Sequence, residues 1–395
     1  MKPFIFSRVL TLILLMAFLA AVLAACNMAV IMPPSTSTPL PTDEPPFLLT
    51  PSAVSLVSTA TPAPTPTITA TLPPPLPVLH VAYTSGGSRL AAATNDSIYL
   101  LDPGLLSLQG VIENVQPLSL SISSDGSMLA AGLTDLGVVL YAANDGAPIH
   151  VLEAGGRFRA GPGLVAFSPD GQQIAAISET DARAIQIWWW QNNALLTTLN
   201  GHRAPLTALA FSPDGALLAS TDMAGELRLW RTGDGKLLVQ SAAHSGPIAS
   251  LAFTPNGEQL ATAGEDGLVR LWRIEMTADF LAGALPGHEL HTAMPLTQIV
   301  ISPLCTDTAC LLAAAGPQGG SLWDVVGDEH LLELPGEVFA VAFSPGGSTL
   351  AAASEGVAFY QINQDQPETF GSLLVRWQPP PKVESGPPGL GESTP

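Results

Sequence analysis

The sequence predicts an all-β fold built from seven similar units, and three observations carry this prediction. A turn motif of the type Phe-Ser-Pro-Asp-Gly recurs seven times along the chain, at intervals of 39 to 48 residues. An apolar run precedes each turn, and a short Ala-rich run follows it. Four short strands per unit, repeated seven times, indicate a seven-bladed β-propeller.

The turns separate the first two strands of each unit. Pro fixes φ and Gly tolerates a positive φ, so Pro-Asp-Gly favours a tight turn. Alanine favours helices, which leaves the Ala-rich runs ambiguous by themselves, but their short length between Gly and Pro favours strands. Clear copies of the turn begin at Phe167, Phe211, Phe253 and Phe343, and weaker copies begin at Tyr83, Ile122 and Ile301.

A ring of this kind must be closed at its last unit. The run Phe370–Trp377 can supply a fourth strand from the C-terminal side, and Pro75–Leu79 could instead supply a strand from the N-terminal side. We favour the C-terminal strand, and we expect the propeller to span residues 78–377.

Residues 1–25 have the composition of a secretory signal. A short basic start, Met1–Arg8, precedes the apolar run Val9–Leu23 and two small residues. Cys26 follows directly, and this pattern resembles the signal of bacterial lipoproteins, in which the cysteine is lipidated and becomes the new N-terminus. The resemblance implies a lipid anchor on Cys26 and a bacterial, extracytoplasmic location. A retained membrane anchor is the alternative, although the apolar run is just shorter than the roughly 17–25 residues of a spanning helix.

Two segments outside the propeller have compositions that disfavour a packed core. Among residues 27–77, 14 are Pro, 10 are Thr and 5 are Ser. We therefore expect residues 26–77 to form an extended linker, with an upper reach of roughly 160 Å at about 3.1 Å per residue. Residues 378–395 are also rich in Pro and Gly, and we expect a disordered tail there.

Two kinds of dipeptide stand out in the repeats: Gly-His, at Gly201-His202 and Gly287-His288, and a single Trp-Asp, Trp323-Asp324. They resemble the dipeptides of the WD-repeat β-propeller family, and the resemblance covers about residues 78–377. It implies a non-catalytic interaction scaffold.

The same family holds a blade together with a hydrogen-bonded set of His, Ser or Thr, Asp and Trp. The Asp orients the His ring, the Ser or Thr hydroxyl bridges the His and the Trp, and the buried indole N–H of the Trp thereby has a hydrogen-bond acceptor. The resemblance implies a complete set with the family's spacing at His244, Thr262, Asp266 and Trp272. In the preceding unit Ala224 holds the Asp position, so we expect a weaker, partial set of His202, Ser220 and Trp230, although Asp222 lies nearby and could compensate.

Composition and motifs argue against several functions. The formal charge of −19 disfavours nucleic-acid binding, because phosphate contacts need a basic surface. The sequence lacks HExxH, GxSxG and GxxxxGK[ST] motifs, and its His and Asp spacings do not indicate a metal site. We therefore expect no cofactor, no metal and no catalytic residue.

Cys305 and Cys310 lie in the first turn of the sixth unit, which is longer than the other copies. The two ends of a hairpin face each other, so a disulfide can close this loop, and an exported compartment permits it. Free thiols are the alternative.

Acidic side chains recur in the loop between the second and third strands of the units. The family places this loop on one face, which implies an acidic rim around the channel mouth, suited to a basic partner. Ordinary turn chemistry is the alternative. The candidate rim residues are Asp96, Asp135, Asp181, Asp222, Glu265 and Glu355.

Three consecutive tryptophans end the third run of the third unit. Trp188 has the spacing of the structural Trp, which leaves Trp189 and Trp190 as extra aromatic residues. Neighbours on a strand alternate in direction, so at least one of the two should point outward. An exposed aromatic ring could anchor a partner, and packing at the blade edge is the alternative.

These features predict a membrane-tethered, extracytoplasmic scaffold that binds a protein or peptide, with a basic partner favoured. Two alternatives stay open: an extracytoplasmic hydrolase or lyase with a site at the channel mouth, and a ligand-binding sensor or envelope-assembly component. A cluster of His and carboxylate groups with perturbed pKa values at the channel would favour the enzyme. A broad acidic face with an exposed Trp would favour the scaffold.

Overall fold

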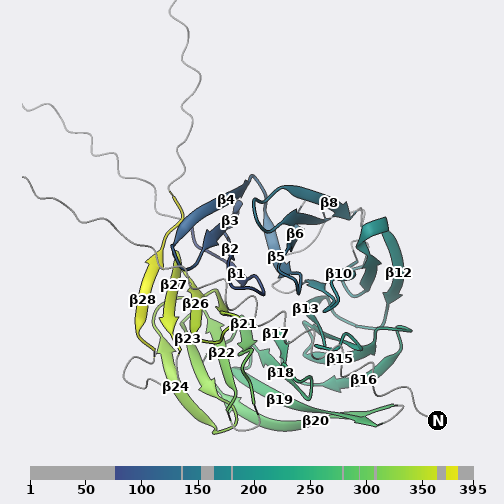
Figure 1. Cartoon of the computed structure of the whole chain (residues 1–395). Coiled ribbons are helices and arrows are strands. Elements are labelled where there is room, and N and C mark those ends of the chain that lie inside the picture. The colour runs from purple at the N-terminus through teal and green to yellow at the C-terminus, as the bar shows by residue number, and fades with distance from the viewer. Residues whose placement is uncertain are drawn as a thin grey trace, which may run out of the picture. The chain divides into compact units, whose positions relative to one another are not determined.

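Seven small antiparallel sheets form the folded part of the chain. The computed structural model describes residues 76–134, 137–152, 164–178, 181–277, 280–292, 294–306, 309–362 and 371–380. Within these residues there are 28 strands in seven four-stranded sheets, and the only helical element is the short 3-10 turn η1 (Trp190–Asn192). The sheets stand around a common centre as the blades of a propeller (Figure 1). The prediction of an all-β, seven-bladed β-propeller is confirmed.

Each blade is built from four consecutive strands, with the first at the centre of the ring and the fourth at its outer edge (Figure 1). The first strands are β1 (His80–Tyr83), β5 (Pro117–Ile122), β9 (Val165–Phe167), β13 (Leu206–Phe211), β17 (Ile248–Phe253), β21 (Gln298–Ile301) and β25 (Ala340–Phe343). The second strands are β2 (Leu90–Ala93), β6 (Met128–Leu133), β10 (Gln173–Ile177), β14 (Leu217–Asp222), β18 (Gln259–Gly264), β22 (Leu311–Gly316) and β26 (Thr349–Ala353).

The outer half of each blade completes the sheet. The third strands are β3 (Ser97–Asp102), β7 (Gly137–Ala142), β11 (Ile185–Trp189), β15 (Glu226–Arg231), β19 (Leu268–Thr277), β23 (Gly319–Asp324) and β27 (Val357–Gln361). The fourth strands are β4 (Ser107–Glu113), β8 (Pro148–Leu152), β12 (Ala194–Leu199), β16 (Leu237–Ala242), β20 (Phe280–His291), β24 (Glu329–Leu334) and β28 (Leu373–Trp377).

The recurring Phe-Ser-Pro-Asp-Gly motif forms the turn between the first and second strands. In the fourth blade, the Ser212 hydroxyl donates to Asp214 at 2.6 Å and accepts the backbone N–H of Leu217 at 2.9 Å. Gly215 has φ of 72°, a left-handed conformation that glycine adopts without a steric penalty. The motif therefore supplies its own hydrogen bonds, which explains why a short, charged turn recurs at each inner hairpin.

The Ala-rich second strands form the interior of the ring. In β22 all six residues are buried, and Ala313, Ala314 and Ala315 have no exposed surface. Small side chains allow neighbouring sheets to approach closely, and the larger Leu, Ile and Trp side chains of the third strands fill the space between blades.

The ring is closed by packing between the first and last blades. β28 completes the last sheet by pairing with β27, with Val357 opposite Trp377, as favoured from the sequence. The Tyr99 and Trp377 rings lie 5.4 Å apart between their centroids, and the Val78 N–H donates to the Ser354 carbonyl at 2.7 Å. Each first strand contacts the next around the full circle, including β25 against β1. Residues 76–79 form no strand.

Several predicted features lie outside the described residues. They are the signal segment 1–25, Cys26, the linker up to Pro75, Asp135 and the tail from residue 381. In the part of the chain that the structure describes, no helix has the length and apolarity needed to cross a membrane.

Candidate functional site

The fifth blade contains the complete hydrogen-bonded set. His244 Nδ1 lies 2.9 Å from Asp266 Oδ1, and its Nε2 lies 2.8 Å from Thr262 Oγ1. The Trp272 indole N–H donates to the same hydroxyl oxygen at 2.9 Å. The ionised carboxylate accepts the Nδ1–H, so Nε2 accepts the Thr262 proton, and the chain of bonds runs from Trp to Asp without an unpaired group.

The fourth blade holds a second set that is also complete, so the expectation of a partial set is wrong and the alternative, compensation by Asp222, is what the structure shows. Asp222, rather than a residue at Ala224, accepts His202 Nδ1 at 2.8 Å. His202 Nε2 lies 2.7 Å from Ser220 Oγ, which also accepts the Trp230 indole N–H at 2.8 Å. Asp222 is the last residue of β14, so its carboxylate is turned into the blade directly from the strand.

The pKa values of these groups follow from burial and hydrogen bonding. Burial raises the pKa of Asp222, but hydrogen bonds from His202 and from the Glu226 N–H outweigh it, and the pKa lies below its usual value. Burial likewise raises the pKa of Asp266, but hydrogen bonds, above all from His244, outweigh it, and this pKa also lies below its usual value. Burial lowers the pKa of His244, against the opposing pull of Asp266. Both carboxylates therefore stay ionised near neutral pH.

Ser220, His202 and Asp222 have the order of a nucleophilic triad, but they are closed to a substrate. The Ser220 and Asp222 side chains have no exposed surface, and the Ser220 oxygen already accepts the Trp230 N–H. A catalytic serine must reach a substrate carbonyl, which this burial prevents. The arrangement fits a structural role.

The same group does not fit a metal ion. His202, Asp222 and Glu226 place one ligand atom each within 4.8 Å of one another. However, His202 Nδ1 carries the proton that it donates to Asp222, and the Arg228 guanidinium contacts Glu226 directly. The guanidinium repels a cation, and the Asp222 carboxylate already accepts the Ala224 and Glu226 amides.

Of the predicted rim residues that the structure describes, four lie in the turns between second and third strands, which share one face of the ring: Asp96, Asp181, Glu265 and Glu355. Glu265 and Glu355 are exposed, and Asp96 is partly exposed. Asp181 lies on the same face but pairs with Arg183 at 2.9 Å. Asp222 is not part of the surface: its carboxylate is buried by the bonds to His202 and to the Ala224 and Glu226 amides, which corrects its assignment to the rim.

Two further acids on this face escaped the sequence reasoning. Glu113 ends β4 opposite Ser97, and Glu337 lies in the connection from β24 to β25; both are exposed. They precede the first strand of the next blade, and those connections reach the same face as the turns between second and third strands. We define the acidic rim as Asp96, Glu113, Glu265, Glu337 and Glu355.

The acidic rim occupies one side of the ring, from the fifth blade through the seventh to the first. Within the described residues, no ion pair involves Glu265, Glu337 or Glu355. On the fourth and fifth blades, Arg228 pairs with Glu226, and Arg270 pairs with Asp266 and Glu289.

The extra tryptophans differ in exposure. Trp189 is 36% exposed at the end of β11. Trp190 is partly buried in η1, where its indole N–H donates to the Gly171 carbonyl at 2.8 Å and its ring meets His150. Trp189 is therefore available to a partner, while Trp190 packs at the blade edge.

Cys305 and Cys310 form a disulfide across the first turn of the sixth blade, with their Cα atoms 4.2 Å apart. Cys310 is buried and Leu304 is largely exposed. The bond closes the long turn at its base.

The inner strands form an uncharged channel wall. The seven first strands contain no Asp, Glu, Lys or Arg. Their single histidine, His80, has its pKa lowered to about 4 by burial and is neutral at physiological pH. Such a wall offers no pair of acid and base for hydrolysis.

Comparisons with known proteins agree with this architecture. Residues 193–231 and 235–273 match the model of the WD domain, G-beta repeat. The chain is 36% identical over 138 residues, 34% of its length, to an uncharacterized WD repeat-containing protein of Synechocystis. It is also 45% identical over 56 residues, 14% of its length, to a periodic tryptophan protein 2 homolog of Neurospora crassa, and 36% identical over 67 residues, 16% of its length, to the rat transducin beta-like protein 3.

These matches are partial on both sides. The chain spans 38% of the Synechocystis protein, 6% of the Neurospora protein and 8% of the rat protein. The matched repeats include the fourth blade, the first two strands of the fifth blade and part of its third strand, and thus both hydrogen-bonded sets. The seven-bladed fold and these matches together support a WD-repeat β-propeller, a fold that is generally a non-catalytic scaffold for binding proteins or peptides.

Proposed function

We propose that this chain is an extracytoplasmic scaffold that binds a basic protein or peptide segment through its acidic rim, and that a lipid on Cys26 tethers it to a bacterial membrane. The observation that carries the binding proposal is the group of exposed carboxylates on one side of one face. Three of them, Glu265, Glu337 and Glu355, have no ion-pair partner in the described part of the chain.

Electrostatics favours a basic partner at this face. Exposed carboxylates without counter-charges produce a negative potential that attracts Lys- and Arg-rich segments and accelerates their association. The negative charge of the whole chain adds to this field. Trp189 ends β11 opposite Gln173, beside the turn between β9 and β10 on the face opposite the rim, so it takes no part in the rim proposal.

A non-catalytic role agrees with the chemistry of the interior. The Ser220, His202 and Asp222 group is sealed inside its blade, and the channel wall carries no charged side chain in the inner strands. The groups with shifted pKa values in these sets, Asp222, Asp266 and His244, make hydrogen bonds within their own blades.

The two ends of the propeller emerge on the rim face. Val78 bonds to Ser354 in the turn between β26 and β27, and Trp377 lies opposite Val357 just after that turn. A tether through Cys26 would hold the propeller within roughly 160 Å of the membrane, the upper reach of the linker, so partners at the same surface would be accessible to it. Labelling with a fatty-acid analogue should mark the wild-type chain and not Cys26→Ser; equal labelling would contradict the anchor.

Capture of partners tests the binding proposal. The rim variant Glu265→Gln/Glu337→Gln/Glu355→Gln removes three negative charges from the face. The control variant Asp234→Asn/Glu258→Gln/Glu329→Gln removes three from the turns at the opposite face. Proteins retained by the wild type and the control, but lost from the rim variant, would support the proposal. Equal retention by all three proteins would refute it.

A further inference from the structure

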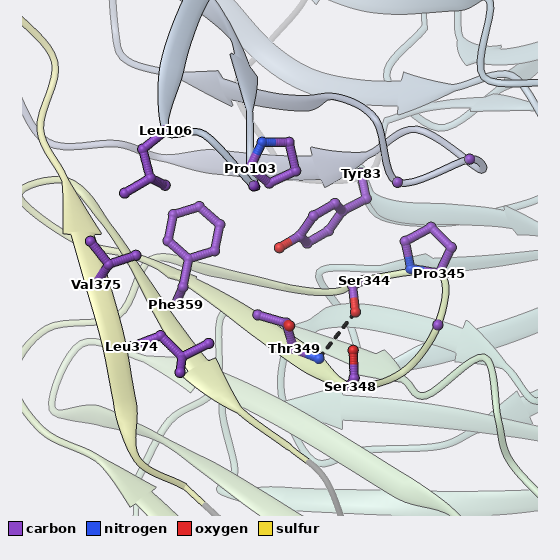
Figure 2. A pocket seen from close by; sticks show the side chains of 14 residues that line it. Tyr83, Pro103, Leu106, Ser344, Pro345, Ser348, Thr349, Phe359, Leu374 and Val375 are labelled. Carbon is purple, nitrogen blue, oxygen red and sulfur yellow. Dashed lines mark hydrogen bonds between the residues drawn. The ribbon is translucent and has the colours of Figure 1, made fainter. Parts of the chain in front are cut away.

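Two cavities between neighbouring blades differ in their chemistry. The seam cavity, with a volume of about 630 Å³, lies where the first and last blades meet, and Tyr83, Phe359 and Pro345 are among its lining residues (Figure 2). None of its lining residues carries a charge. A second cavity, of about 200 Å³, lies between the fifth and sixth blades, and its lining combines Trp323 with Glu333. We call it the blade-six cavity, and it is the one of the two that offers a charge to a ligand.

In the fourth and fifth blades, an arginine of the blade itself stands at the place that this cavity has in the sixth. Arg228 and Arg270 each lie on the third strand, two residues before the structural tryptophan of their blade. The guanidinium carbon of Arg228 lies 5.7 Å from the centre of the Trp230 ring. Arg270 donates to Glu289, which lies opposite it on the outer strand, at 2.8 Å. The two blades thus show a guanidinium held by a Trp ring and by a carboxylate.

The sixth blade has the same tryptophan and the same acid, but it has no arginine. Ser321 lies two residues before Trp323 and takes the register position of the arginines. Glu333 lies opposite Ser321 on β24, just as Glu289 lies opposite Arg270 on β20. Because a short hydroxyl side chain stands in place of a long guanidinium, space is left beside the Trp ring and the carboxylate. The blade-six cavity is this space.

The groups that line the cavity favour a planar cation. Within the described residues, the Glu333 carboxylate has no ion-pair or hydrogen-bond partner, and neither Lys nor Arg lines the cavity. The Trp323 indole N–H donates to the Ser321 hydroxyl at 2.9 Å, and the His330 ring packs against the Trp323 ring at 4.7 Å between centroids. The Trp ring is therefore held in place before a ligand binds. A guanidinium can stack on such a ring and pair with a carboxylate at the same time.

The size and position of the cavity suit a single side chain of a bound partner. Its volume of about 200 Å³ is below the roughly 300–1,000 Å³ of pockets for whole small molecules. Its lining includes Thr292 and Met294, in the connection after β20, and Gly319 at the start of β23. These segments lie at the face that carries the acidic rim.

We propose that the blade-six cavity binds an arginine side chain, with its guanidinium against Trp323 and paired with Glu333. The arginine takes the place that Arg228 and Arg270 occupy in their own blades, and it anchors the partner beside the acidic rim. The assignment of this arginine to a basic partner rests on the proposed function above. The affinity of the cavity for a guanidinium does not.

Titration of the full chain with N-acetyl-arginine methylamide tests the cavity. The readout is the NMR signal of each isotope-labelled tryptophan indole N–H, and Trp323→Phe identifies the signal of Trp323. We expect this signal to shift and saturate in the wild type. Glu333→Gln should weaken the affinity about fivefold, the upper range for an exposed ion pair. Glu329→Gln is the matched control, because it removes the same charge from the other end of β24, outside the cavity.

A variant that fills the cavity provides a second test. Ser321→Arg restores the arrangement of the fourth and fifth blades, so its own guanidinium should compete with the probe and weaken binding at least about tenfold. N-acetyl-lysine methylamide should bind the wild type at least about fivefold more weakly than the arginine probe, because a lysine ammonium does not stack or pair in the same plane.

Each result decides the proposal. Absence of a saturable shift of the Trp323 signal, equal affinities of Glu333→Gln and Glu329→Gln, or unchanged binding to a folded Ser321→Arg variant would refute the site. Equal affinity for the lysine probe would refute the selection of arginine. If the probe binds as expected while the rim variant retains all partners, the proposed function fails and the arginine site stands. If the rim variant loses its partners but the probe does not bind, the arginine site alone fails.

Discussion

Removing the Asp222 carboxylate should destabilise the propeller more than removing Asp266. Asp222→Ala leaves three donors without an acceptor: His202 Nδ1–H, 2.8 Å away, and the Ala224 and Glu226 N–H groups, 2.9 and 3.0 Å away. Since the Asp222 side chain has no exposed surface, water does not readily replace it. The buried His202 donor accounts for about 2–3 kcal/mol and the two turn amides for about 1–2 kcal/mol together, which gives about 3–5 kcal/mol.

Asp266→Ala should cost about 1–2 kcal/mol, because the site offers replacements. The Asp266 side chain is 12% exposed, and its bonds to the Ser245 and Leu268 amides are longer, at 3.3 and 3.2 Å. Arg270 Nη1 already lies 3.0 Å from His244 Nδ1, so a change of His tautomer gives that nitrogen a new donor.

Thermal unfolding of the full chain measures the difference. For a domain of about 300 residues, 1 kcal/mol corresponds to about 1.5 °C in Tm. We expect a fall of about 5–8 °C for Asp222→Ala and about 2–3 °C for Asp266→Ala. Asp222→Asn keeps an acceptor for the turn amides and should fall between them. A larger loss for Asp266→Ala than for Asp222→Ala would refute the reasoning.

Three further predictions concern pH, closure and the disulfide. The pKa of His80 in the folded protein, about 4, lies below its usual 6.5, so the free energy of unfolding should decrease as pH drops from 6.5 toward 4, by up to about 3 kcal/mol. The Tm of His80→Gln should therefore fall less than the wild-type Tm between pH 7 and pH 5, and an equal fall in both proteins would contradict this. Trp377→Ala should lower the free energy of unfolding by about 3–5 kcal/mol and accelerate hydrogen exchange first in β1, β2 and β26–β28. Uniform acceleration in all blades would contradict a closure between the first and last blades. Cys305→Ala/Cys310→Ala should lower stability by about 2 kcal/mol, as expected for a short closed loop; an unchanged Tm, with the disulfide verified in the wild type by mass spectrometry, would show that the bond adds nothing.

Much of the fold could be predicted because its signals are local. The turn motif contains the hydroxyl, carboxylate and glycine that build each inner hairpin, as at Ser212, Asp214 and Gly215. The spacing from His244 to Asp266 likewise led to a pair that the structure brings within 2.9 Å. Each copy of the motif determines the geometry of its own hairpin, and seven copies are enough to predict a seven-bladed ring.

The features that escaped prediction depend on distant or directional effects. Asp222 counted as a surface acid because it lies near a turn, but its place at the end of β14 turns the carboxylate inward, which spacing alone does not reveal. The seam cavity joins Tyr83 to Phe359 from opposite ends of the propeller sequence, so no local pattern marks it. Glu113 and Glu337 were missed because the connections between blades vary in length.

The dependence of partner binding on salt tests the central claim of an acidic binding face most directly. A partner captured by the wild type should be identified, and its Kd measured between 50 and 300 mM salt for the wild type, the rim variant and the opposite-face control. We predict that affinity for the wild type and the control falls steeply with salt, and that the rim variant binds more weakly with a flatter dependence. Parallel curves of equal affinity for all three proteins would contradict the claim.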